Sequence, residues 1–138
     1  MPARRKTLRQ RIEDRIARRR DDAFLTREFR DLGGERQVLR ALRELTEAGK
    51  LIRLGYGAYG RAEASRLTGQ PVLAARDGLM GAARQTLDKL GVPWEQTDLQ
   101  RAYNEGRSTQ VPVNPAIRVK GRFSRRLRYL DTDVRLER

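Results

Sequence analysis

Three arginines and a glutamine, Arg36, Gln37, Arg40 and Arg43, recur at short spacing within residues 35–48. A guanidinium group can donate two parallel hydrogen bonds to O6 and N7 of guanine, and a side-chain amide can pair in the same way with adenine. On a helix, the three arginines would share the side opposite the apolar residues. These four side chains are therefore suited to recognising bases in DNA. A charged triplet is also ordinary solvated surface, and the sequence leaves both interpretations open.

A second set of side chains is suited to phosphate contact rather than to base recognition. These residues belong to a basic N-terminal arm, to the start of a short helix and to a glycine-containing hairpin. Such contacts fix the register of a protein on DNA without reading its sequence. The predicted backbone and hairpin contacts are Arg4, Arg5, Lys6, Thr26, Arg27, Lys50, Arg53, Tyr56 and Arg61.

The net charge points to an acidic partner. The chain of 138 residues carries a formal charge of +13 with a pI near 11.3, which favours nucleic acid. The excess lies in residues 1–20 and 107–138, whereas residues 21–106 hold as many acidic as basic side chains. The C-terminal basic run suits either nucleic acid or an acidic protein: Arg122, Arg125, Arg126 and Arg128.

The residues that most enzymes depend on are missing. The sequence has no Cys and no His, which excludes disulfides, a thiol nucleophile, a cysteine zinc site and the commonest general base. It has no glycine-rich phosphate loop and no nucleophile elbow, and Asp131 and Asp133 are a weak signal for a metal. We therefore expect no enzymatic activity, no cofactor and no metal. No apolar run is long enough to span a membrane, so we expect a cytoplasmic bacterial protein with no membrane partner.

The elements that must position the arginines follow from hydrophobic spacing. Residues 7–19 and 35–48 have apolar stripes at helical spacing, residues 23–25 are a possible strand, and Thr26 caps a short predicted helix over 27–32. Glycines 33 and 34 supply the turn between the helices. Runs on either side of Gly55-Tyr56-Gly57 predict a hairpin, in which strand alternation makes Tyr59 a core residue. This order of elements predicts a winged helix-turn-helix.

The remaining chain divides less clearly. Residues 77–90 predict a helix that stops at Gly91, Trp94 is a predicted core residue, and a short helix follows from about residue 98. Two or three short strands are expected in residues 107–138. We predict an α+β fold that is mainly helical. The predicted domains are a winged helix-turn-helix with a basic arm over 1–61, a connector over 62–76 and a small α+β domain over 77–138.

Residues 35–61, ERQVLRALRELTEAGKLIRLGYGAYGR, resemble the winged-helix segment of the AbiEi-type antitoxins of type IV toxin–antitoxin systems. The resemblance rests on the apolar helix repeat, on Ile52-Arg53 and on Gly57-Ala58-Tyr59. It continues through residues 66–71 and through a Thr-Gln-Val-Pro element at 109–112, and covers most of residues 8–130.

The resemblance implies an autorepressor whose N-terminal domain binds inverted repeats in its own promoter. The C-terminal domain would oppose a nucleotidyltransferase-like toxin and help adjacent copies to associate on DNA. The region over 62–138 is short compared with the fuller antitoxins, which affects toxin neutralisation more than DNA binding.

The first functional hypothesis is therefore a sequence-specific regulator of transcription that binds double-stranded DNA and lies on the nucleoid when bound. The alternative is an antitoxin that acts mainly by contact between its C-terminal region and a toxin. A third hypothesis is non-specific packaging of RNA or DNA by charge alone.

Overall fold

The structure, a computed structural model, describes residues 5–110, 116–121, 126–129 and 132–137. The helices are α1 (Leu8–Arg18), the 3₁₀ helix η1 (Thr26–Phe29), α2 (Glu35–Glu47), α3 (Gly78–Leu90) and α4 (Asp98–Asn104). The strands are β1 (Ala23–Leu25), β2 (Leu51–Gly55), β3 (Ala58–Ala64), β4 (Pro71–Leu73), β5 (Trp94–Gln96), β6 (Ala116–Val119), β7 (Arg128–Tyr129), β8 (Thr132–Asp133) and β9 (Arg135–Glu137). The predicted α+β class is confirmed. None of the helices in the described ranges is long and apolar enough to cross a membrane.

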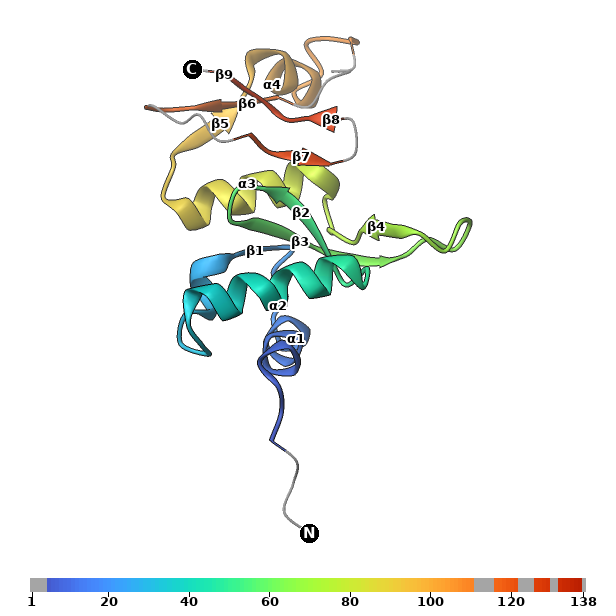
Figure 1. Cartoon of the computed structure of the whole chain (residues 1–138). Coiled ribbons are helices and arrows are strands. Elements are labelled where there is room, and N and C mark those ends of the chain that lie inside the picture. Colours follow the sequence, from blue (N-terminus) through green and yellow to red (C-terminus); the bar gives the residue numbers. More distant parts are fainter. Residues whose placement is uncertain (1–4, 111–115, 122–125, 130–131, 138) are drawn as a thin grey trace.

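An antiparallel sheet with strand order β1-β3-β2 forms the middle layer of the molecule (Figure 1). Phe24 of β1 lies opposite Tyr59 of β3. Successive side chains of a strand point to opposite faces, so Phe24 faces one side of the sheet while Ala23 and Leu25 face the other. All three are buried. Strand β1 is therefore apolar along its whole length because elements cover both of its faces.

Helices α1 and α2 cover one face of this sheet. Thr7 caps α1: its hydroxyl accepts a hydrogen bond from the Gln10 backbone N–H, and the Gln10 side chain accepts one from Thr7 N–H. Helix α2 follows its predicted course and is followed by Gly49, whose φ of 76° is the left-handed conformation that glycine favours at this position. The buried residues of this first core are Ile12, Ile16, Phe24, Phe29, Val38, Ala41, Leu42, Leu45, Leu51 and Tyr59.

Helix α3, strand β7 and the segment around Leu127 cover the opposite face. Leu25 and Leu54 from the sheet share this second core with Leu87, Ile117 and Leu127. A small sheet, β5-β6-β9, lies beyond α3, and β7 pairs with β8. Both regions predicted as separate domains, 1–61 and 77–138, thus contribute residues to the second core.

Three local predictions were wrong. The helix expected over 27–32 is the single 3₁₀ turn η1. The connector expected over 62–76 extends the sheet, because β3 continues to Ala64 and pairs with β4. Trp94, predicted to lie in the core, is half-buried at its edge, where its Nε1–H donates to Asp88 Oδ1 at 2.7 Å.

The shared core gives a direct test of the fold. Leu87→Ala removes a fully buried side chain of α3 that belongs to the same core as Leu25 and Leu54. We expect a loss of about 2–5 kcal/mol in the free energy of unfolding in one cooperative denaturant transition. The control is Leu67→Ala, where the side chain is 96% exposed; its effect should stay within about 0.5 kcal/mol. Two separate transitions, with only one shifted by Leu87→Ala, would contradict a shared core.

Candidate nucleic-acid interface

The solvent face of α2 carries the four predicted base-reading residues together. Arg36, Gln37, Arg40 and Arg43 are all exposed, because the opposite side of the helix is held in the first core. The Arg40 side chain is 75% exposed, and its Nε lies 3.6 Å from Glu44 Oε1, one helical turn later. An exposed pair of this kind contributes little to stability, so the guanidinium can exchange Glu44 for another acceptor at small cost.

The β2–β3 hairpin places an aromatic side chain at its tip. Tyr56 is 74% exposed, whereas Tyr59 is only 7% exposed and belongs to the first core, as predicted. Arg53 is exposed on the adjacent strand, and its Nε lies 3.4 Å from the Gly55 carbonyl oxygen. The tip therefore presents one cation and one phenol ring to solvent.

A groove of 440 Å³ separates this hairpin from η1 and the start of α2. Arg27, Arg30 and Arg53 line it together with Tyr56, and Glu35 supplies the acidic side chain of the lining. Arg30 was not among the predicted contacts, although its spacing of three from Arg27 could have indicated it. From α2 the groove is lined by Glu35 and Leu39, so it borders this helix, and its cations come from η1 and the hairpin.

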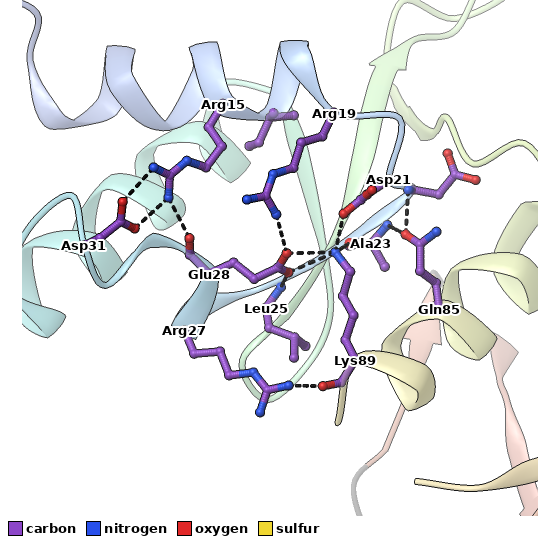
Figure 2. A network of polar contacts seen from close by, with 12 residues as sticks. Arg15, Arg19, Asp21, Ala23, Leu25, Arg27, Glu28, Asp31, Gln85 and Lys89 are labelled. Carbon is purple, nitrogen blue, oxygen red and sulfur yellow. Dashed lines mark hydrogen bonds and ion pairs between the residues drawn. The ribbon is translucent and has the colours of Figure 1, made fainter. Parts of the chain in front are cut away.

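Helix α3 fixes the position of η1 through an ionic cluster (Figure 2). The Lys89 ammonium donates to Asp21 Oδ2 at 2.7 Å, to the Ala23 carbonyl at 2.6 Å and to both oxygens of Glu28 at 2.9 and 3.0 Å. It also lies 4.9 Å from the centre of the Phe24 ring. Only 19% of the Lys89 side chain is exposed. The lysine thus joins α3 to β1 and to the turn that precedes α2.

Further hydrogen bonds complete this junction. Gln85 Oε1 accepts from the backbone N–H groups of Asp22 and Ala23 at 2.7 and 2.6 Å. Glu28 Oε2 accepts from Leu25 N–H at 2.6 Å, which closes the 3₁₀ turn. The Arg27 guanidinium donates to the Lys89 carbonyl. Arg27 is therefore exposed but already oriented by α3.

Arginines of α1 hold the same turn from the other side. The Arg15 guanidinium donates to both carboxylate oxygens of Asp31 at 2.6 and 2.7 Å and to the Glu28 carbonyl at 2.8 Å (Figure 2). These bonds hold the pKa of Asp31 at about 2, below its usual 3.8, and raise the pKa of Arg15. Arg19, the C-cap residue that follows α1, donates to Glu28 Oε1 at 2.8 Å. Part of the basic charge of α1 therefore serves the fold.

The structure removes Arg61 from the predicted contact set. Its guanidinium donates to the carbonyl oxygens of Ile16, Arg19 and Asp21 at 3.0, 2.7 and 2.9 Å, and lies 5.5 Å from the centre of the Phe24 ring. The residue caps the end of α1 and the following segment, because the last carbonyl groups of a helix lack intrahelical donors. Its role is structural.

Thr26 is also corrected. It does not cap a helix, because η1 begins at Thr26 itself. Its hydroxyl oxygen is buried, while its backbone N–H donates to the Gly57 carbonyl at 3.1 Å. The residue therefore ties η1 to the hairpin tip through its backbone, and it belongs to the lining of the groove.

The remaining predicted contacts lie away from the groove. Lys50 stands at the opposite end of the β2–β3 hairpin from Tyr56, with its Nζ 3.8 Å from Glu13 Oε2. Lys6 Nζ bonds to Asp14 Oδ2 at 2.5 Å, which lowers the pKa of Asp14. Arg5 is exposed, and Arg4 lies outside the described residues. The groove thus brings Thr26, Arg27, Arg53 and Tyr56 together beside the start of α2, but not Lys50 or the arm.

Comparison of the sequence and structure with family models, with curated proteins and with solved structures gives no match. The resemblance to AbiEi-type antitoxins therefore stays a prediction.

Loss of the Lys89 ammonium should loosen the junction. In Lys89→Met, Asp21 and Glu28 lose a shared cation while both remain partly buried, and we expect a loss on the order of 3 kcal/mol in the free energy of unfolding. Lys120→Met is the control, because Lys120 is exposed, and it should change stability by less than about 0.5 kcal/mol. Chemical denaturation at neutral pH measures both. Equal stability of the two variants would show that the cluster does not hold α3 to η1.

Proposed function

We propose that this protein is a sequence-specific regulator of transcription that binds double-stranded DNA through a winged helix-turn-helix over residues 8–64. The succession α1, β1, η1, α2, β2, β3 and the strand order β1-β3-β2 support this proposal. In such a unit α2 enters the major groove and the β2–β3 hairpin is the wing. The resemblance to AbiEi-type antitoxins adds the expectation of autorepression at inverted repeats.

One observation carries the proposal: the solvent face of α2 presents Arg36, Gln37, Arg40 and Arg43, and its other face is buried. These are residue types that pair with the major-groove edges of guanine and adenine. The groove that borders α2 at Glu35 and Leu39 is lined by arginines of η1 and the wing. Side chains suited to bases thus lie next to side chains suited to phosphates, as a DNA-reading surface requires.

A second candidate function is an antitoxin that acts through protein contact. Its support is α4, in which no residue is buried and in which Leu99 and Tyr103, four positions apart, are both exposed. Apolar side chains one helical turn apart are typical anchors for a protein partner. This surface lies at the opposite end of the molecule from α2 (Figure 1).

Gel-shift titration with the DNA upstream of the protein's own gene tests the proposal. The wild-type protein should bind this duplex more tightly than a scrambled duplex of equal length. Arg40→Ala should weaken binding to the upstream duplex by about 1–3 kcal/mol, which is roughly 5- to 150-fold, with a smaller loss on scrambled DNA. The loss should be unequal because only the upstream duplex offers the base that Arg40 would contact.

Arg101→Ala is the matched control. Arg101 is exposed on α4, far from α2 in Figure 1, so its removal takes away one positive charge without touching the proposed reading face. It should leave the preference for the upstream duplex unchanged. Equal affinity of the wild-type protein for both duplexes would overturn the proposed function.

A further inference from the structure

A second basic cleft lies on the far side of the wing from the groove beside α2. It has a volume of 390 Å³ and is lined by Arg53 and Tyr56 of the wing and by Arg126 and Arg128 of the C-terminal segment. Asp133 is the acidic neighbour of the two C-terminal arginines, with carboxylate oxygens 3.9 Å from Arg126 Nε and 3.5 Å from Arg128 Nε. The cleft keeps an excess of positive charge.

The fold holds the C-terminal segment against the wing at this point. A Cβ atom at position 55 would overlap the Arg126 carbonyl oxygen, so the glycine of β2 permits the close approach of the two backbones. Leu127 is buried in the second core, and its carbonyl accepts from Val134 N–H at 2.9 Å. Because side chains alternate along an extended segment, Arg126 and Arg128 point away from the core, into the cleft.

The two basic depressions share their central residues. Arg53 and Tyr56 line both the groove beside α2 and the cleft beside the C-terminal segment. A strip of arginines therefore continues from Arg27 and Arg30, past the wing tip, to Arg126 and Arg128. An elongated polyanion with regularly spaced charges matches this strip better than a single small anion does. Guanidinium groups bind phosphate oxygens through paired hydrogen bonds.

We propose that Arg126 and Arg128 extend the wing into a two-sided clamp for the phosphodiester backbone of duplex DNA. This inference rests on the proposed function, because the strip passes beside α2, where Glu35 and Leu39 line the groove. The C-terminal segment then supplies affinity that is independent of sequence, whereas α2 supplies discrimination between sequences. The basic tail acts together with the wing, although about seventy residues of chain separate them.

The salt dependence of binding tests the clamp. Each phosphate that a protein neutralises adds about 0.9 to the slope of log K against log salt concentration. The double variant Arg126→Ala/Arg128→Ala should therefore lower the magnitude of the slope by about 1.8 and should weaken binding to the upstream and scrambled duplexes by the same factor. Arg126→Lys/Arg128→Lys should keep the wild-type slope, because counterion release follows charge.

Arg135→Ala is the control from the same C-terminal region. Arg135 is exposed on β9 and bonds to Glu137 at 2.8 Å, outside the cleft, and its removal should leave the slope unchanged. Arg53→Ala tests the wing side of the clamp and should lower the slope by about 0.9. Circular dichroism of each variant establishes that it remains folded.

The outcomes separate the two proposals. An unchanged slope in Arg126→Ala/Arg128→Ala overturns the clamp, even if the wild-type protein prefers the upstream duplex. A lowered slope with no preference in the wild type supports the clamp and overturns sequence-specific recognition. Loss of preference in the double variant, with the slope unchanged, also overturns the assigned role of the C-terminal arginines.

Discussion

The ionic cluster around Lys89 is the interaction on which the proposed DNA-reading unit depends. One ammonium group from α3 is shared by Asp21, the Ala23 carbonyl and Glu28, and it lies over the Phe24 ring. Each partner belongs to the segment that leads into the turn before α2. A short 3₁₀ turn has few bonds of its own to fix its direction. Helix α3 on one side, and Arg15 and Arg19 on the other, hold the 3₁₀ turn in place.

The sheet burial explains why the C-terminal half belongs to the same functional unit. With α1 and α2 on one face and α3 and the segment around Leu127 on the other, both faces of the central sheet are covered near the base of the wing. The same packing brings the segment around Leu127 to the wing tip, beside Gly55. This packing places basic residues from the end of the sequence on the surface that we propose contacts DNA.

Hydrophobic spacing predicted the local elements well, since the periodicity of α2 and the core position of Tyr59 depend on neighbouring residues. It could not predict the roles of Arg61 and Lys89, because a charged residue in a sequence does not reveal a distant partner. The sequence also could not predict that both faces of the sheet are buried. Strand β1 is so short that its apolar run fits a sheet covered on one face as well as one covered on both. The position of Arg126 beside the wing could not be predicted either, because it depends on tertiary packing alone.

Selection from a random pool of duplex DNA tests the central claim most directly, because every short sequence competes in it and no operator has to be chosen beforehand. If α2 reads bases, repeated binding to the wild-type protein should enrich one short motif. The Arg36→Ala, Arg40→Ala and Arg43→Ala variants should each relax the preference at particular positions of that motif, chiefly at guanines. Bound duplexes with the same base composition and sequence distribution as the starting pool would contradict the account.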